Sequence, residues 1–286
     1  MEIASIGTSA LVSVAELAPL LGDESLLVID CRFVLNEVDA GRDAYLEAHI
    51  PGARYAHLES ELSGPPNSDC GRHPLPSPNH LCKLFGYLGI APGIRVVVYD
   101  DSYGMVAARL WWMLRYMGHA TVAVLDGGWQ SWTAAGLEVT AGHETGRQRR
   151  FTGRPDSSRL MTVRDIDSAT PLVDAREAAR FRGEIEPIDP VAGHIPGALN
   201  HCWRDNLRES GTFLELSALR ESFVRSLGQL PDHNTTHYCG SGVSACHNIL
   251  AQVAAGLPEP RLYCGSWSEW CRVMIDAGPP TEAGTY

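Results

Sequence analysis

One segment dominates the interpretation of this sequence: His237-Tyr238-Cys239-Gly240-Ser241-Gly242-Val243-Ser244-Ala245-Cys246-His247-Asn248-Ile249-Leu250. Residues 234–238 are typical of the end of a strand, and a turn rich in glycine and serine follows them. In residues 245–255 apolar side chains recur at helical spacing, and the pattern ends at Gly256. We therefore expect Cys239 at the end of a strand, where a turn opens onto the N-terminus of a helix.

This turn has the composition of an anion-binding nest. Gly240 and Gly242 let the backbone curl so that consecutive N–H groups point inward. The helix behind the turn adds unpaired N–H groups and the positive end of its dipole. Because such a site favours the thiolate form of a cysteine, we predict that Cys239 is a catalytic nucleophile. The turn residues expected to bind the substrate are Gly240, Gly242, Val243 and Ser244.

Four other interpretations of the segment fit less well. A buried structural cysteine does not need Gly-Ser-Gly after it. A dinucleotide-binding turn would leave too short a remainder of chain for a nucleotide-binding half. A cysteine phosphatase needs an arginine that closes its anion loop, where this chain has Ala245. The candidate ligands of a zinc site have spacings that match no common motif; they are His237, Cys239, Cys246 and His247. We predict no metal and no other cofactor.

Composition limits the function classes. The formal net charge of -11 argues against nucleic acid or an anionic membrane as the main partner. No apolar run approaches the roughly 18 residues of a membrane-spanning helix, and the N-terminus lacks a signal-peptide pattern. We therefore expect a cytoplasmic protein in which the eight cysteines are reduced.

The two halves of the chain repeat three landmarks in the same order. Val28-Ile29-Asp30 matches Leu172-Val173-Asp174, His49-Ile50-Pro51-Gly52-Ala53 matches His194-Ile195-Pro196-Gly197-Ala198, and Gly127-Gly128-Trp129 matches Gly265-Ser266-Trp267. Short strands alternating with helices at this spacing predict two α/β domains with parallel sheets. We place the N-terminal domain at residues 1–140 and the C-terminal domain at residues 160–286. Residues 141–159 are rich in glycine, arginine and serine, and a solvated linker is favoured there over a nucleic-acid patch.

The segment that begins at Cys239, together with Gly265-Ser266-Trp267-Ser268-Glu269-Trp270, resembles the active-site region of the tandem-domain sulfurtransferases. This is the rhodanese and 3-mercaptopyruvate sulfurtransferase family. The Gly-Ser-Gly-Val turn is more similar to the mercaptopyruvate branch than to the thiosulfate branch. The resemblance covers nearly the whole chain and implies two tandem rhodanese-like domains, each a mainly parallel five-stranded sheet flanked by helices.

The resemblance also implies a reaction. Cys239 takes a sulfane sulfur from 3-mercaptopyruvate as a persulfide and passes it to a thiol or to cyanide, so ping-pong kinetics are expected. Thiosulfate:cyanide transfer by the same cysteine is the alternative, and a sulfur-carrying or protein-binding module with little turnover is an alternative of another class. Asp100 aligns with Cys239 in the first half, and because a carboxylate cannot carry a sulfane sulfur, that half is expected to be catalytically silent. Family resemblance makes thioredoxin the expected acceptor, and a monomer is the default.

By the same resemblance, Ser241 donates a hydrogen bond to the departing enolate. It is polarised by His49 and by an acidic residue, Asp43 or alternatively Asp39, although His49 could instead be a turn histidine. Carboxylate recognition calls for arginines, and Arg180 matches the first carboxylate-binding arginine of the mercaptopyruvate enzymes.

A second arginine is expected after the Glu-Pro pair, and this sequence has Ile188 there. Because Ile188 cannot bind a carboxylate, a preference for mercaptopyruvate requires another arginine to bind the substrate carboxylate. Arg72 and Arg182 are the candidates for that role, and Arg176 is a further candidate for substrate binding.

Overall fold

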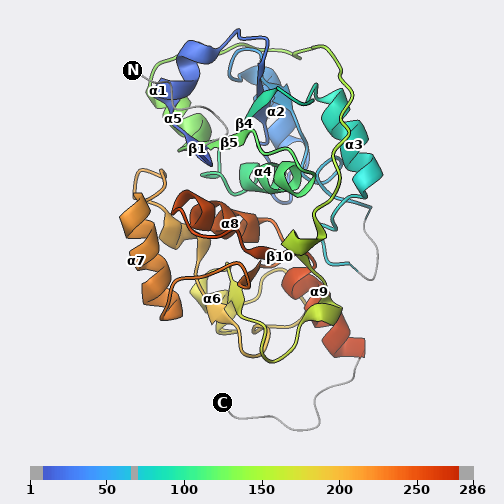
Figure 1. Ribbon diagram of the computed structural model, residues 1–286, viewed down its shortest axis with the longest axis vertical. Coiled ribbons are helices and arrows are strands. Elements are labelled where there is room, and N and C mark those ends of the chain that lie inside the picture. Colours follow the sequence, from blue (N-terminus) through green and yellow to red (C-terminus); the bar gives the residue numbers. More distant parts are fainter. Residues whose placement is uncertain (1–8, 66–69, 277–286) are drawn as a thin grey trace.

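The structure is a computed structural model in which residues 9–65 and 70–276 are described. Two α/β domains lie one above the other, with the N-terminal domain in the upper half of Figure 1. Each contains a five-stranded sheet in which every strand pair is parallel. The predicted fold class is confirmed. The outer ends of the two expected domains, residues 1–8 and 277–286, lie outside the described residues.

The two sheets have the same strand order, β1-β5-β4-β2-β3 and β6-β10-β9-β7-β8. The central strands are continuous apolar runs, as expected for strands covered on both faces. The N-terminal strands are β1 Leu11–Val12, β2 Leu26–Asp30, β3 Arg54–Tyr55, β4 Arg95–Tyr99 and β5 Val122–Leu125. The C-terminal strands are β6 Leu160–Met161, β7 Leu172–Asp174, β8 Leu199–Asn200, β9 Thr236–Tyr238 and β10 Arg261–Tyr263.

Helices cover both faces of each sheet. Along β4, Val96 and Val98 face one apolar cluster, whereas Val97 and Tyr99 face another that contains Trp132, as the alternation of side chains in a strand requires. The N-terminal helices are α1 Val14–Leu17, α2 Ala40–Glu47, α3 Pro78–Tyr87, α4 Ala107–Tyr116 and α5 Gly128–Ala134. The C-terminal helices are α6 Ala178–Phe181, α7 Leu216–Leu227, α8 Ser244–Ala254 and α9 Ser266–Asp276. Short 3-10 turns are η1 Ala18–Leu20, η2 Ser157–Arg159, η3 Val163–Asp165 and η4 Trp203–Asn206.

The first described segment of the chain contains three short elements. Leu11–Val12 form strand β1, and α1 starts only after Ser13, whose side chain caps it. Pro19 then lies in the 3-10 turn η1, because proline cannot donate the backbone hydrogen bond that would continue an α-helix.

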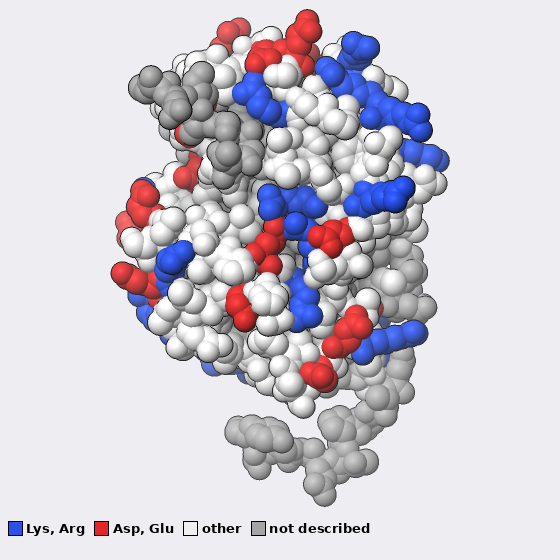
Figure 2. All heavy atoms as spheres, viewed as in Figure 1, with Lys and Arg blue, Asp and Glu red and all other residues white. Residues whose placement is uncertain are grey.

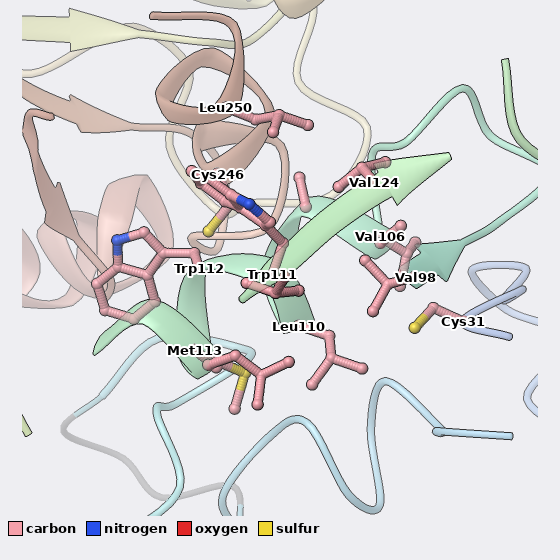
Figure 3. Packing of buried hydrophobic residues seen from close by; sticks show 14 of the residues in the cluster. Cys31, Val98, Val106, Leu110, Trp111, Trp112, Met113, Val124, Cys246 and Leu250 are labelled. Atoms are coloured by element: carbon pink, nitrogen blue, oxygen red, sulfur yellow. The ribbon is translucent and has the colours of Figure 1, made fainter. Parts of the chain in front are cut away.

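The two domains share a core. Helix α4 of the N-terminal domain packs against α8 of the C-terminal domain, and Figure 3 shows Trp111 and Trp112 beside Cys246 and Leu250. All four side chains are fully buried and belong to one continuous apolar cluster. The turn in front of α8, which carries Cys239, is therefore held against the N-terminal domain.

The strand register supports the alignment of the two halves. Asp30 pairs with Tyr99 between β2 and β4, and Asp174 pairs with Tyr238 between β7 and β9. The hydroxyl of Tyr99 accepts a hydrogen bond from the N–H of Ile50 at 3.2 Å, and that of Tyr238 accepts one from Ile195 at the same distance. Since the two tyrosines are equivalent, the residues that follow them, Asp100 and Cys239, are equivalent too.

The chain between the domains follows the N-terminal domain closely (Figure 1). The N–H of Gly142 donates to the carbonyl of Leu46, and the N–H of Arg149 donates to that of Gly86. On the face shown in Figure 2, basic and acidic side chains are interspersed. Within residues 9–65 and 70–276, no helix combines the length and apolar character needed to span a membrane.

Candidate active site

Cys239 follows β9 directly, and its backbone is fixed by α9. Its N–H donates to Ser266 Oγ at 3.1 Å, and its carbonyl accepts from the N–H of Trp267 at 3.0 Å. The Sγ atom accepts a hydrogen bond from the N–H of Gly242 at 3.1 Å. Gly242 has φ +78, and a Cβ there would lie 2.5 Å from the carbonyl oxygen of Cys264. This position of the turn therefore requires glycine.

The duplicated turn in the N-terminal domain shows how this geometry treats an anion. The carboxylate of Asp100 is buried and accepts four backbone hydrogen bonds from the turn and the helix start that follow it. The donors are Ser102 at 2.8 Å, Gly104 at 2.8 Å, Val106 at 2.7 Å and Ala107 at 2.8 Å. A turn of this kind gathers N–H groups around negative charge, as expected for a nest.

A pocket of about 200 Å³ lies between the domains at this turn. Cys239, only 2% exposed, lines it. This pocket therefore gives a donor molecule access to the sulfur. The other lining residues come from both domains and are Phe33, Leu35, Leu58, Arg72, His73, Met105, Val106, Arg176, Glu177, Arg180, Ile188, Trp203, Gly240, Ser241, Val243 and Ser244. A larger cavity of about 410 Å³ in the N-terminal domain is lined by none of these residues.

Ser241 meets a histidine from the other domain. Its Oγ lies 2.7 Å from Nδ1 of His73, and both side chains are buried. Burial, reinforced by the positive charges of Arg109 and Arg72, lowers the pKa of His73 from 6.5 to about 4. The imidazole is therefore neutral at physiological pH and can hold the serine hydroxyl in one orientation.

Two arginines, one from each domain, flank the turn. A Cβ on Gly240 would lie 2.9 Å from Nη2 of Arg72 and 3.7 Å from Nη2 of Arg180. The carboxylate of Asp189 bridges the two guanidinium groups, since Arg72 Nη1 contacts its Oδ1 and Arg180 Nη2 lies 3.3 Å from its Oδ2. Arg180 is held further by Glu186 at 2.6 Å. The pocket thus carries two guanidinium groups beside Gly240, each paired with a carboxylate.

Comparison with known proteins places this geometry in a family. Residues 13–135 and 160–273 each match the family model described as "Rhodanese-like domain". The chain belongs to the rhodanese family. It is 45% identical to the "Probable 3-mercaptopyruvate sulfurtransferase" of Pseudomonas aeruginosa, over 98% of this chain and 100% of that protein. It is 35% identical to the thiosulfate sulfurtransferase of Gallus gallus, over 86% of each chain.

Solved structures agree with this assignment. The 3-mercaptopyruvate sulfurtransferase from Leishmania major superposes with a TM-score of 0.84 at 31% identity, over 95% of this chain and 78% of that one. The prediction of tandem rhodanese-like domains is confirmed.

The structure does not bring His49 to Ser241. His49 is fully buried in the N-terminal domain, where it stacks on Tyr45 and its Nδ1 lies 2.8 Å from the Tyr45 carbonyl. His194 makes the same contact with the Phe181 carbonyl at 2.7 Å and stacks on its ring. Because the histidine of this landmark has the same role in both halves, the alternative of a turn histidine describes His49 better.

The acidic residues expected to act with His49, Asp43 or alternatively Asp39, also lie outside the pocket. Asp43 is exposed on α2, and neither Asp43 nor Asp39 lines the pocket. The histidine at Ser241 is His73. Within the part of the chain that the structure describes, no carboxylate makes a hydrogen bond or ion pair with it.

Arg176 is occupied by structural contacts, although it reaches the pocket wall. Its guanidinium binds Asp174 at 2.7 Å and the carbonyl of Gly193 at 2.6 Å, and it lies over the ring of Trp267. Arg32 makes the matching contacts with Asp30, Ala48 and Trp129. Since the half without a cysteine has the same cluster, these contacts give Arg176 a structural role, and its role in substrate binding stays a prediction.

Of the other arginines considered, Arg72 reaches the pocket and Arg182 does not. Arg182 is exposed and paired with Glu184 at 2.6 Å. Ile188, where a second arginine was expected, lines the pocket with 42% of its surface exposed. Within the described residues, no group of three or more histidine, cysteine or acidic side chains could hold a metal ion.

Sequence reasoning did not find His73 or Asp189. His73 ends a loop rich in turn formers and carries no periodic signal, so only the packing of the domains brings it to Ser241. Asp189 follows Ile188, the residue found where the family resemblance implies a second arginine. Its neighbours in the sequence do not indicate that it bridges two arginines.

Proposed function

We propose that this protein is a sulfurtransferase that moves sulfur from 3-mercaptopyruvate through a persulfide on Cys239 to a thiol or to cyanide. The observation that carries the proposal is the equivalence of Cys239 with Asp100. The carboxylate of Asp100 accepts four N–H groups from its turn, and Sγ of Cys239 already accepts one from Gly242. Backbone N–H groups are directed at the side chain at this position of the fold and oppose the cost of burying a charge there, and only the C-terminal half places a sulfur there.

In the first step the Cys239 thiolate attacks the sulfur of mercaptopyruvate. An S–S bond forms, the C–S bond breaks, and its electrons go to the enolate of pyruvate, which takes up a proton. The hydroxyl of Ser241 is suited to donate a hydrogen bond to the developing enolate oxygen, and neutral His73 orients it. In the second step a thiolate or cyanide attacks the outer sulfur and releases Cys239.

The persulfide has an expected location in the turn. In a cysteine, Sγ takes the position of Cγ in an aspartate, so the outer sulfur of a persulfide takes the position of a carboxylate oxygen. Aligned on the starts of α4 and α8, Val243 and Ser244 take the places of Val106 and Ala107, and the N–H of Gly242 already donates to Sγ at 3.1 Å. These groups support the negative charge of the persulfide between the two steps.

Arg72 and Arg180 are suited to hold the carboxylate of mercaptopyruvate. They approach the turn from opposite domains, and each offers planar N–H groups that match a carboxylate. Arg72 thereby takes the place of the arginine missing at Ile188. Asp189 keeps the two guanidinium groups in position and reduces the net positive charge that a substrate meets, which favours a monoanion over a dianion.

Steady-state assays with the two donors test this function. The protein is given 3-mercaptopyruvate or thiosulfate with cyanide as acceptor, and kcat/KM is compared. A higher value for mercaptopyruvate is expected, together with a mass increase of about 32 Da on Cys239 that is absent from Cys239→Ser. A preference for thiosulfate would instead assign the rhodanese activity, for which the two arginines beside the sulfur also provide a suitable cationic pocket.

Three further expectations belong to the same proposal. The N-terminal half, with Asp100 at the nucleophile position, is catalytically silent, and Asp100→Cys tests whether the turn alone can accept sulfur. A protein thiol such as thioredoxin is the acceptor, tested by the rate at which reduced thioredoxin removes the persulfide. A monomer acts in the cytoplasm, tested by sedimentation and by cell fractionation.

A further inference from the structure

Arg109 is a buried cation that takes part in no step of the proposed reaction. It projects from α4 of the N-terminal domain, has 0% of its surface exposed, and reaches the underside of the Cys239 turn. Among the described residues it takes part in no ion pair with a carboxylate. Burying a charge without an opposite charge is strongly unfavourable, so its presence here calls for a reason.

The contacts of Arg109 connect the two halves of the active site. Its Nη2 donates to the carbonyl of His73 at 3.0 Å, and its Nη1 donates to the carbonyl of Gly242 at 3.0 Å. His73 is the residue whose imidazole meets Ser241, and Gly242 is the residue whose N–H binds Sγ of Cys239. One planar guanidinium therefore sets the relative position of the proton-handling pair and the nucleophile turn.

The charge of Arg109 also faces sulfur. Its Nη1 lies 3.2 Å from Sγ of Cys264, and its Nε has no hydrogen-bond partner. Burial lowers the pKa of Arg109, but the thiols of Cys264, Cys246 and Cys239 more than offset this, and the net direction is upward. Of these three cysteines only Cys239 lines the pocket, so it is the one at which the reaction creates negative charge.

We infer that Arg109 is a positioning residue that aligns the His73–Ser241 pair with the Cys239 turn and balances the sulfur anion on Cys239. The inference rests on the proposed function and adds to it. It separates two effects. The hydrogen bonds of Arg109 to the carbonyls of His73 and Gly242, here called the clamp, position the His73–Ser241 pair that the enolate of mercaptopyruvate needs. The positive charge of Arg109 stabilises the Cys239 thiolate with either donor.

Three variants separate these effects. Arg109→Met removes both clamp and charge, Arg109→Lys keeps the charge without the two-point clamp, and Arg115→Met is the control. Arg115 lies on the same helix and also reaches the other domain, where it pairs with Glu259. The readouts are kcat/KM for the two donors and the pH dependence of Cys239 alkylation by iodoacetamide, followed on its own peptide because the chain has eight cysteines.

The other titratable groups near Cys239 are the same in all these proteins, so differences between them report on Arg109. In the pocket these groups are Arg72, His73, Arg176, Glu177 and Arg180, and beneath the turn they are Cys246 and Cys264. For Arg109→Met we expect the midpoint of alkylation to move up by about one pH unit or more. We also expect mercaptopyruvate turnover to fall at least about 10-fold further than thiosulfate turnover. Arg109→Lys should have the wild-type pH midpoint of Cys239 alkylation but a lowered ratio of mercaptopyruvate to thiosulfate turnover. Arg115→Met should change neither quantity.

Several results would overturn the inference. An unchanged midpoint in Arg109→Met, with both donors reduced equally, would mean that Arg109 only supports the fold. If Arg109→Met does not fold, Arg109→Lys alone tests the inference. If that variant keeps the wild-type ratio of kcat/KM between mercaptopyruvate and thiosulfate, the two-carbonyl clamp has no role in the reaction. If Cys264→Ser reproduces the shifted midpoint, the charge acts on Cys264 instead. Absence of a persulfide in the wild-type protein would reject the proposed function, while the alkylation midpoints would still test Arg109.

Discussion

Nδ1 of His73 lies 2.7 Å from Oγ of Ser241, although the two residues belong to different domains. Neither half of the chain can form this pair alone. The shared core between α4 and α8 holds the domains in the position that the pair requires. The duplication thus supplies the turn with Cys239 in one copy, and a histidine in the other copy completes the pocket at that turn.

Replacing His73 should separate the two donors. In His73→Gln, we expect kcat/KM for mercaptopyruvate to fall by about 100-fold, because the enolate loses its oriented hydroxyl. Thiosulfate turnover should change far less, because sulfite leaves without a proton. His49→Gln is the matched control, a buried histidine outside the pocket, and should leave the donor ratio unchanged. Equal losses with both donors in His73→Gln would contradict this role.

The sequence around Cys239 was informative because its signals are local. Glycine positions, the apolar run before them and the helical spacing after them together predict a strand, a turn and a helix, and the structure has β9, the turn and α8 there. His73 was not predictable in this way. Its contact with Ser241 comes from the packing of two domains, and no periodicity marks it.

Arg176 shows the opposite case, a residue whose structural contacts could have been inferred from a signal in the sequence. The pattern Asp-Xaa-Arg occurs at Asp174 and again at Asp30, in the half that has no cysteine. A residue type repeated in both halves at the same place is better explained by folding than by catalysis, and the contacts with Trp267 and Gly193 agree with that.

The substitute arginine can be tested directly. In Arg72→Met, KM for mercaptopyruvate should rise about 10-fold or more, as expected for the loss of a charged hydrogen bond. Adding Ile188→Arg to that variant should restore part of the affinity, since position 188 lines the same pocket. Arg182→Met serves as the control, because Arg182 is exposed and outside the pocket. An unchanged KM in Arg72→Met would remove Arg72 from carboxylate binding.

Gly242 offers a test of the nest itself. Gly242→Ala places a Cβ 2.5 Å from the carbonyl of Cys264 and at φ +78, so the turn must shift and the N–H that binds Cys239 moves with it. We expect activity with both donors to fall by at least about 100-fold. Gly228→Ala has a similar φ of +74 with no atom within 4 Å, and it should lower stability by about 1 kcal/mol without loss of kcat. Comparable activity in the two variants would argue against the nest.

Buried histidines predict a loss of stability in mild acid. Burial lowers the pKa of His237 to about 4 and that of His247 to about 3, from 6.5. Since the unfolded chain takes up these protons first, the stability contribution is complete above pH 6.5 and is lost as the pH falls toward the folded-state values. At pH 5, each histidine should lower the free energy of unfolding by about 2 kcal/mol relative to pH 8.

A comparison of variants isolates this contribution from that of buried carboxylates such as Asp100, whose pKa is raised by burial and which act in the opposite direction. Urea unfolding of His237→Gln should show a pH dependence smaller by about 2 kcal/mol over this range. His143→Gln, an exposed position, should keep the wild-type dependence. Parallel curves for His237→Gln and wild type would show that the fold does not lower the pKa of His237.

The shared core predicts that the two domains unfold together. Leu110 on α4 and Leu250 on α8 are fully buried in one cluster that spans both domains. Truncating either to alanine should lower the free energy of unfolding by about 2–5 kcal/mol. Exposed Leu46, at 39%, should cost less than about 0.5 kcal/mol when changed to alanine. Tryptophan fluorescence and far-UV circular dichroism should report one coincident transition in each protein. Two separated transitions, with Leu250→Ala moving only one of them, would mean that the domains fold independently and that the pocket is assembled from two separately stable units.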